Sequence, residues 1–185
     1  DLQVVVLNDA STDGTGEIVD RISESHTNIT ALQGDGSPLP EGWFGKPWAC
    51  QRAQQSASGD WLLFIDADVV IAEEALSRAI AYAKRNSLDM VTGIGEMVML
   101  SFWEKVLQPA VGGMILAGNS LRKVNNHDLK DHNLANGQFI LVSRKAYDAI
   151  GGHESVKNNI IDDIGIARAL IAKDFKYHCL DLQEL

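Results

Sequence analysis

The sequence has few cysteines, no basic cluster and no long apolar run. Its two cysteines, Cys50 and Cys179, lie far apart and indicate neither a disulfide framework nor a zinc site. The formal net charge of −9 argues against binding to nucleic acid. No apolar stretch approaches the roughly 18 residues of a membrane-spanning helix, and no signal-peptide pattern is found. We therefore expect a cytoplasmic protein.

The length of 185 residues and the hydrophobic content of 45% predict a single domain over residues 1–185. Leu2–Leu7 is a nearly continuous, β-branched apolar run, which predicts a buried strand at the start of the sequence. Because this central type of strand has no lead-in, we expect a fragment of a longer protein, truncated before Asp1 and also after Leu185.

Two aspartates follow the most apolar segment of the sequence. Trp61–Ile65 predicts a strand buried on both faces, and Asp66 and Asp68 come directly after it. Residues i and i+2 of an extended segment share one face, so both carboxylates can approach one divalent ion. Mg²⁺ and Mn²⁺ favour such oxygen ligands, and Mg²⁺ usually adds substrate phosphates. We predict a Mg²⁺ or Mn²⁺ site for a nucleoside diphosphate; the alternative is a strand-end turn with helix-capping carboxylates.

Strands and helices alternate along the rest of the sequence, which predicts an α/β fold. The expected strands are 29–33, 88–94, 137–142 and 175–180, and the expected helices are 15–25, 48–57, 73–85, 144–150 and a last one opening at Asp162. Lys46 ends a loop over 34–46 that is rich in glycine and proline. It is either a phosphate-binding residue or an exposed surface lysine.

The loop after the first strand has a calcium-binding alternative. The residues at ligand and turn positions of an EF-hand loop are Asp9, Ser11, Asp13, Gly14 and Asp20. An EF-hand normally ends on a glutamate and is flanked by a helix, whereas this loop ends on an aspartate and follows a strand. We therefore favour a strand-to-helix turn that places Asp9 at the carboxyl edge of the sheet.

Residues 97–118 are mostly apolar but include Glu104, Lys105 and Pro109. This segment is too short and too interrupted to span a bilayer. Because helical apolar stripes usually belong to the core, we favour a buried helix. The alternative is an interfacial helix on a membrane. The residues that it would present to lipid are Phe102, Trp103, Leu107 and Met114.

Asp162 and Asp163 open the last expected helix. Carboxylates are favourable at the start of a helix, where they accept hydrogen bonds from free N–H groups and complement the helix dipole. Asp162 is the better N-cap candidate, and Asp163 suits the first turn. From the residues alone, capping is the simplest role for the pair.

Five segments together resemble the family 2 glycosyltransferases of GT-A fold, particularly the bacterial membrane-associated branch that acts on polyprenoid or carotenoid-type lipids. The segments are VVVLNDASTDGT, GWFGKPWACQRA, GDWLLFIDADV, NGQFILVSRKAYDAIGGHE and the Asp162-Asp163 pair. They occur in the expected order and span nearly the whole chain. The resemblance implies a Rossmann-like fold with a mostly parallel central sheet flanked by helices, without the family's first strand.

The resemblance also implies a donor site. Asp9 matches an aspartate that binds the base or ribose of the nucleotide. Asp66 and Asp68 match the motif for metal and diphosphate, with Asp68 the more direct metal ligand. We place Lys46 in the same donor site. One departure is Asn8, which stands where the family usually has an aspartate.

On the acceptor side, Asp163 matches the carboxylate that acts as general base on the acceptor hydroxyl. Gly137 and Gln138 fall in the segment that borders the donor and acceptor sites. A second departure is Asp162, which stands where the family usually has a glutamate.

The implied activity is a metal-dependent, inverting transfer of a hexosyl group from a nucleotide-diphosphate sugar to an acceptor hydroxyl. The metal offsets charge on the leaving diphosphate while Asp163 takes a proton. Lipids are candidate acceptors, with peripheral contact at the inner face of the cell membrane. Two alternatives stay open: a catalytically silent nucleotide-sugar-binding domain and a nucleotidyltransferase on a similar sheet.

Overall fold

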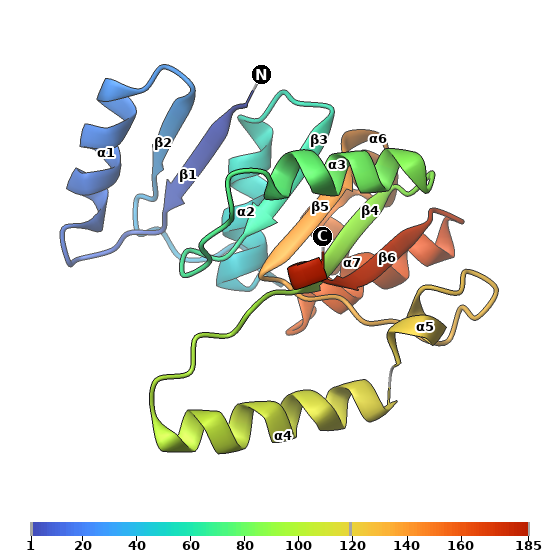
Figure 1. Ribbon diagram of the computed structural model, residues 1–185. Coiled ribbons are helices and arrows are strands. Elements are labelled where there is room, and N and C mark those ends of the chain that lie inside the picture. Colours follow the sequence, from blue (N-terminus) through green and yellow to red (C-terminus); the bar gives the residue numbers. More distant parts are fainter. Residues whose placement is uncertain (1, 119, 185) are drawn as a thin grey trace.

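The computed structural model of the protein describes residues 2–118 and 120–184. Strands and helices alternate as expected (Figure 1). The strands are β1 (Val4–Asn8), β2 (Ile29–Gln33), β3 (Trp61–Ile65), β4 (Met90–Ile94), β5 (Phe139–Ser143) and β6 (Tyr177–Asp181). The α-helices are α1 (Thr15–Ser25), α2 (Gly45–Gln55), α3 (Ala75–Arg85), α4 (Phe102–Gly118), α5 (Leu121–Val124), α6 (Arg144–Ile150) and α7 (Asp162–Ala172). Two 3₁₀ turns are η1 (Gly152–Val156) and η2 (Leu182–Glu184).

The strands form two hydrogen-bonded groups. β1 and β2 pair in parallel, and the larger sheet has the order β3-β5-β4-β6. Within it β4 and β6 are parallel, whereas β5 is antiparallel to both of its neighbours. The α/β architecture is confirmed, and the larger sheet is mixed because the chain returns from the long α4–α5 excursion in the opposite direction and inserts β5 between β3 and β4.

Helices cover both faces of the larger sheet (Figure 1). Alternate residues of β5 pack on opposite faces of this sheet. Ile140 and Val142 pack in the core that includes α6 and α7, while Leu141 packs against Ala79 of α3. Strand residues alternate between faces, so β5 is apolar from Phe139 to Val142 because both of its faces are buried there. This central strand also fixes the loop that precedes it.

The smaller pair of strands is attached through α2. The side chain of Gln3 donates to the carbonyl oxygen of Ser56 at 2.9 Å and accepts from the backbone N–H of Ser58 at the same distance. These bonds join the beginning of β1 to the end of α2. Among the described residues, β1 and β3 each pair with a single neighbouring strand.

Helix α4 lies apart from the core, below the larger sheet in Figure 1. The side chains of Trp103 and Met114 are 66% and 75% exposed. The favoured expectation of a buried helix is therefore wrong. Apolar periodicity predicts that a helix has an apolar face, but it does not predict whether the same domain packs against that face. Within the described residues, no helix has both the length and the apolar character needed to cross a membrane.

Candidate active site

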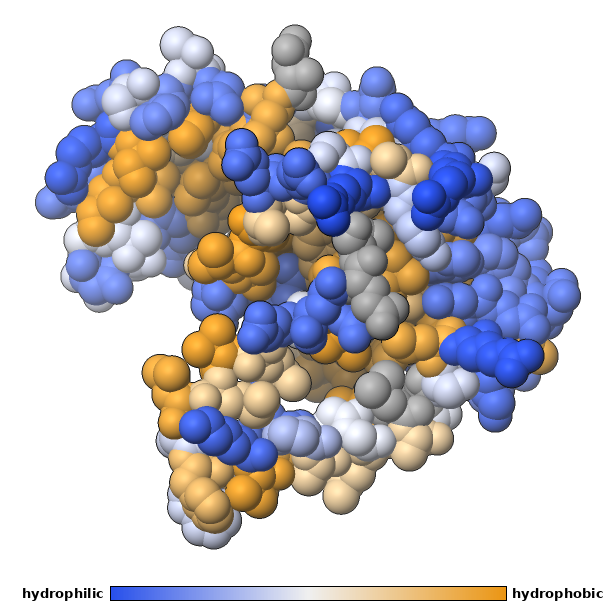
Figure 2. Space-filling model, in the orientation of Figure 1, coloured by the Kyte–Doolittle hydropathy of each residue, from blue (hydrophilic) through white to orange (hydrophobic). Residues whose placement is uncertain are grey.

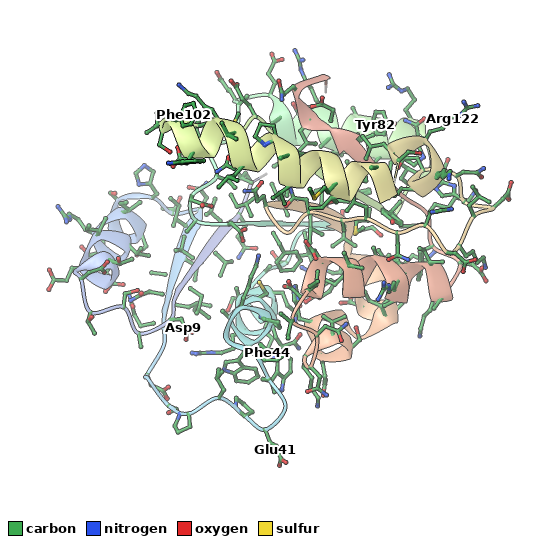
Figure 3. The ribbon with its side chains drawn as sticks, turned by 90° about the horizontal axis from the view of Figure 1, so that it is seen from below. Asp9, Glu41, Phe44, Tyr82, Phe102 and Arg122 are labelled. Atoms are coloured by element: carbon green, nitrogen blue, oxygen red, sulfur yellow. The ribbon has the colours of Figure 1, made fainter. Side chains whose placement is uncertain are left out.

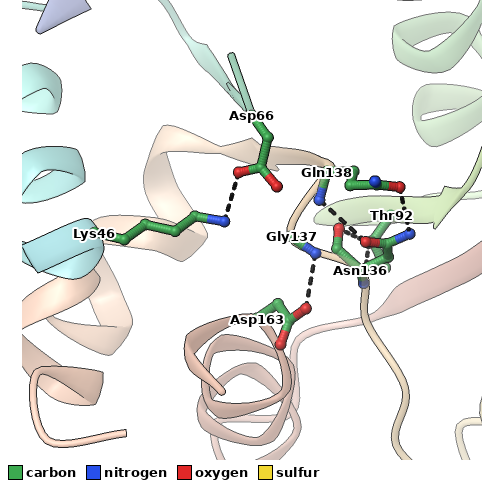
Figure 4. Close-up of polar contacts among 7 residues, drawn as sticks. All are labelled: Lys46, Asp66, Thr92, Asn136, Gly137, Gln138 and Asp163. Atoms are coloured by element: carbon green, nitrogen blue, oxygen red, sulfur yellow. Dashed lines mark hydrogen bonds and ion pairs between the residues drawn. The ribbon is translucent and has the colours of Figure 1, made fainter. Parts of the chain in front are cut away.

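The carboxyl end of β3 meets the first turn of α2 through an ion pair. The ammonium Nζ of Lys46 lies 2.6 Å from Oδ1 of Asp66 (Figure 4). Burial alone would lower the pKa of Lys46, but its hydrogen bond to Asp66 and the nearby charge of Asp162 outweigh burial and raise that pKa. Lys46 is therefore a firmly charged cation beside Asp66.

The beginning of α7 meets the loop before β5 through Asp163. Oδ2 of Asp163 accepts a hydrogen bond from the backbone N–H of Gly137 at 2.7 Å, and Oδ1 accepts one from the N–H of Ile164 at 2.7 Å (Figure 4). Each carboxylate oxygen has one N–H donor and retains a further lone pair. The carboxylate is held in one orientation and can still accept a proton.

Gly137 lies close to both the ammonium of Lys46 and the carboxylate of Asp163. A Cβ atom at this position would be 3.0 Å from Nζ of Lys46 and 3.5 Å from Oδ2 of Asp163. The ammonium and the carboxylate therefore approach the same point from two sides. The structure thus brings together Lys46, Asp66, Gly137 and Asp163, as expected for residues of one site.

A second polar network holds the loop that carries Gly137. The hydroxyl of Thr92 donates to the carbonyl oxygen of Asn136 at 3.1 Å and accepts from its backbone N–H at 3.0 Å. The side-chain amide of Asn136 donates to Oε1 of Gln138 at 3.2 Å, and its oxygen accepts from the N–H of Gln138 at 3.1 Å. Thr92 and Asn136 were not predicted. A buried threonine inside the apolar strand β4 is the signal that could have identified Thr92.

Asp162 does not cap α7, so the prediction that it is the N-cap is wrong. Ile161 occupies the N-cap position because its backbone is the last non-helical one, and no side chain caps the helix there. Asp162 is only 9% exposed. Burial raises its pKa, and Lys46 partly opposes that rise. Asp162 thus belongs to the electrostatic environment of Lys46.

Cys50 lies one turn after Lys46 on α2, close to the same charges. Burial, with a contribution from Asp162, raises the pKa of its thiol to about 12. The thiol is therefore protonated at neutral pH and is a poor nucleophile. Cys50 is therefore a poor candidate for a nucleophile in this site.

Asp66 and Asp68 lie on a turn rather than on the extended face that the sequence predicts. β3 ends at Ile65, and the N–H of Val69 donates to the carbonyl oxygen of Asp66 at 3.1 Å. Asp68 is exposed. No cluster of three or more metal-binding side chains exists in the described part of the chain. Two carboxylates still fit Mg²⁺ or Mn²⁺, because substrate phosphates commonly complete the coordination of Mg²⁺.

Asp9 follows β1 and is exposed in the loop below the smaller sheet (Figure 3). Its neighbour Asn8 is buried, donates to Oε1 of Gln33 at 2.7 Å and accepts from the N–H of Ser11 at 3.3 Å. Asn8 thus braces the loop, and Asp9 is the carboxylate that a ligand can reach. Within the described residues no hydrogen bond or ion pair joins Asp9 to Lys46.

In the loop after β1, two carboxylates that would bind calcium in an EF-hand make other contacts instead. Asp13 accepts hydrogen bonds from the hydroxyl and N–H of Thr15, at 2.6 and 3.2 Å. Asp20 lies within α1 and accepts from the side chain of Gln33 at 2.7 Å. These carboxylates are used to fix a strand-to-helix turn, which is the interpretation that the sequence favoured.

The chain is similar in sequence to curated glycosyltransferases. A 4,4'-diaponeurosporenoate glycosyltransferase of Staphylococcus haemolyticus is 24% identical over 170 residues, a match that covers 91% of this chain and 44% of the relative. The chain thus spans less than half of that relative's length.

Two solved structures share the fold. Staphylococcus aureus TarS 1-349 in complex with UDP has a TM-score of 0.57 at 19% identity, over 97% of this chain and 48% of that one. Glucosyl-3-phosphoglycerate synthase of Mycobacterium tuberculosis, in complex with Mn²⁺, UDP-glucose and phosphoglyceric acid, has a TM-score of 0.50 at 16% identity, over 96% and 57%. These neighbours confirm the expected GT-A type of fold.

The family model described as glycosyl transferase family 2 matches residues 1–151. This range includes Asp9, Lys46, Asp66, Asp68 and Gly137, and it ends before Asp163. It covers most of the chain. The protein therefore belongs to glycosyl transferase family 2.

Proposed function

We propose that this domain is the catalytic part of an enzyme that transfers a sugar from a nucleotide-diphosphate donor to an acceptor hydroxyl, with metal dependence and inversion at the sugar. The observation that supports it best is the approach of Lys46 and Asp163 to one point at Gly137. A cationic group for a diphosphate and a carboxylate for a hydroxyl thus lie on two sides of one space, as a single displacement requires.

The donor side consists of Lys46, Asp66, Asp68 and Asp9. Asp68, with Asp66, would hold Mg²⁺ or Mn²⁺, which when bound offsets charge on the leaving diphosphate. Lys46 contributes an ammonium that can donate to phosphate oxygens. Asp9 would bind the base or ribose. The two solved neighbours named with UDP or UDP-glucose support this class of donor.

On the acceptor side, Asp163 would remove the proton from the attacking hydroxyl. The N–H groups of Gly137 and Ile164 hold its carboxylate in place before the substrate arrives. Such preorganisation avoids an orientational cost during reaction. Gly137 leaves the space in front of Asp163 free of a side chain, and Gln138 borders it. One displacement needs a base and no enzyme nucleophile.

Helix α4 would provide contact with a membrane surface. The surface along α4 is largely hydrophobic (Figure 2). The exposed apolar residues on it are Phe102, Trp103, Val106, Leu107, Val111, Met114 and Ile115. A helix that is apolar around its circumference is unfavourable in water. At about 25 Å its 17 residues are shorter than a bilayer core, so it would lie along the interface.

The charges near α4 agree with this orientation. Glu104 is used at the helix start, where its carboxylate accepts from the N–H groups of Leu100 at 2.7 Å and Ser101 at 2.8 Å. Beyond the other end of α4, Arg122 and Lys123 form a basic pair, and Figure 3 shows Phe102 and Arg122 at opposite ends of this region. Basic residues beside an apolar face favour anionic membrane surfaces.

We infer that the acceptor is a lipid at the inner face of the cell membrane, and membrane contact through α4 would bring the site close to it. The relative named as a 4,4'-diaponeurosporenoate glycosyltransferase is consistent with that acceptor class.

Calorimetry of UDP binding to the full-length protein, with and without Mn²⁺, tests the donor assignment. Binding should require Mn²⁺ and should weaken at least about tenfold in Asp68→Asn, because a carboxylate ligand is lost. Equal binding by Asp68→Asn would refute the metal site. The anomeric configuration of the product, read by NMR, tests inversion.

A further inference from the structure

We propose that Lys46 is a built-in counter-ion of Asp66, which the divalent ion replaces when donor binds, and that the released ammonium then binds the diphosphate. This inference rests on the proposed function. It adds an exchange of cations that couples the binding of metal to the binding of nucleotide.

The ion pair disfavours a second cation at the same carboxylate, because the two cations would repel each other. Nζ of Lys46 and Oδ1 of Asp66 are 2.6 Å apart. Mg²⁺ binds carboxylate oxygen at about 2.0–2.1 Å and strongly repels a nearby ammonium. A metal ion on Asp66 therefore favours movement of Lys46 away from this carboxylate. Both side chains are accessible for this exchange, because Lys46 is 47% and Asp66 is 32% exposed.

The surroundings of Lys46 allow this movement. The ammonium lies close to Gly137, where a Cβ would come within 3.0 Å of Nζ, so a side chain at this position would crowd the lysine. A lysine has a flexible stem and three donors that can turn toward phosphate oxygens. The fixed bonds of the site belong instead to Asp163, which is held by two backbone N–H groups. In the proposed exchange Lys46 is therefore the charge that moves, while Asp163 stays in place.

The exchange predicts positive coupling between the two ligands. Without nucleotide, Lys46 neutralises Asp66. A metal ion that binds alone must then displace Lys46, and the displaced ammonium gains no new partner. With nucleotide present, the displaced ammonium gains phosphate oxygens as partners. The same coupling factor must then appear in both directions, metal on nucleotide and nucleotide on metal.

The test measures free Mn²⁺ by electron paramagnetic resonance during titration of the full-length protein, with and without UDP. Lys46→Met should bind Mn²⁺ alone roughly two- to fivefold more tightly, in keeping with the modest strength of a half-exposed ion pair. UDP should then enhance Mn²⁺ binding less than it does in the wild type. Lys46→Arg, which keeps the charge, should behave like the wild type when Mn²⁺ is added alone.

Lys84→Met on α3 is the matched control for loss of a surface lysine, and melting curves confirm folding. Unchanged or weaker binding of Mn²⁺ alone to Lys46→Met would overturn the exchange. Asp68→Asn separates this failure from failure of the metal site. If Asp68→Asn loses Mn²⁺ while Lys46→Met shows no gain, only the exchange is wrong. If Asp68→Asn binds Mn²⁺ with UDP as the wild type does, the metal assignment itself is wrong.

Discussion

Asp163 and Gly137 are joined by a 2.7 Å hydrogen bond, from the backbone N–H of the glycine to Oδ2 of the carboxylate, across 26 positions of the sequence. A carboxylate that only capped its own helix would have no such distant partner. The bond places Asp163 at the loop before β5, next to the space that Lys46 also approaches.

Asp163→Asn should therefore lower turnover by at least about a hundredfold, because loss of a general base typically costs about 10²–10⁴-fold. Affinity for UDP with Mn²⁺ should stay near normal. The free energy of unfolding should fall by only about 1 kcal/mol, because the amide oxygen can keep one N–H partner while the amide nitrogen loses the other. Steady-state kinetics, calorimetry and melting curves measure these three quantities.

Asp162→Asn is the control for that experiment. Asp162 is a buried carboxylate rather than an N-cap, so its substitution removes no capping bond. Its substitution should leave the melting temperature unchanged or raised, with turnover within a few-fold of wild type. If Asp162→Asn loses turnover and Asp163→Asn keeps it, the base is assigned to the wrong neighbour.

Gly137→Ala tests whether the space beside Lys46 matters. The added methyl group would lie 3.0 Å from Nζ of Lys46, the flexible end of that side chain, so the lysine should give way and the fold should persist. UDP affinity and turnover should fall several-fold while the melting temperature changes little. Gly95→Ala is the matched control, because a Cβ there meets no atom within 4 Å. A large loss of stability in Gly137→Ala would show that the glycine serves the fold.

The double variant Trp103→Glu, Leu107→Glu tests the role of α4. Both side chains are exposed, so the melting temperature should stay near that of wild type, whereas charges placed in a core would unfold the domain. Sedimentation with vesicles that contain anionic lipid should fall at least several-fold. Thr27→Glu, Ser77→Glu carries the same added charge at exposed positions away from α4, in the turn before β2 and on α3. Equal sedimentation of both double variants would remove α4 from the membrane contact.

His153 should make stability depend on pH. It is 1% exposed, and Nδ1 of its ring lies 2.6 Å from the hydroxyl of Tyr147. Burial lowers its pKa from 6.5 to about 4, so the unfolded chain binds a proton more readily. Its contribution is therefore complete above pH 6.5 and is lost as pH falls toward 4, by about 1.4 kcal/mol per pH unit.

Chemical denaturation between pH 7 and pH 4 measures this dependence. His153→Gln should be less stable at pH 7 and should lose less stability on acidification than wild type does. Parallel curves for the two proteins would mean that His153 is protonated equally in the folded and unfolded states.

Local patterns were sufficient to predict most elements, whereas the expectation that Lys46, Asp66 and Asp163 serve one site came from the family resemblance. The 3.6-residue and two-residue periodicities are properties of single segments, which is why α1, α3 and β5 could be recognised. The Lys46–Asp66 pair depends on how α2 docks beside β3, and the direction of β5 depends on where a long excursion returns. Neither is encoded in a local pattern.

The burial of side chains was harder to predict than their chemical type. Asp162 and Asp163 are identical neighbours, yet one is buried near Lys46 and the other is bonded to Gly137. A rotation of 100° per helical residue separates them, and only the packing of α7 decides which direction faces the site. For α4 the same limit applies, since its apolar residues were recognised but their exposure was not.

The candidate site depends on the correct pairing of strand β5. It contributes Leu141 to one core and Val142 to the other, and the loop with Gly137 comes immediately before it. A slip of one residue in its pairing would exchange these side chains between the two faces and would shift the loop by about 3.3 Å. The bond from Gly137 to Asp163 could not survive that shift. Mispaired molecules would therefore lack the site, and measured activity would count only the chains whose sheet is paired in register.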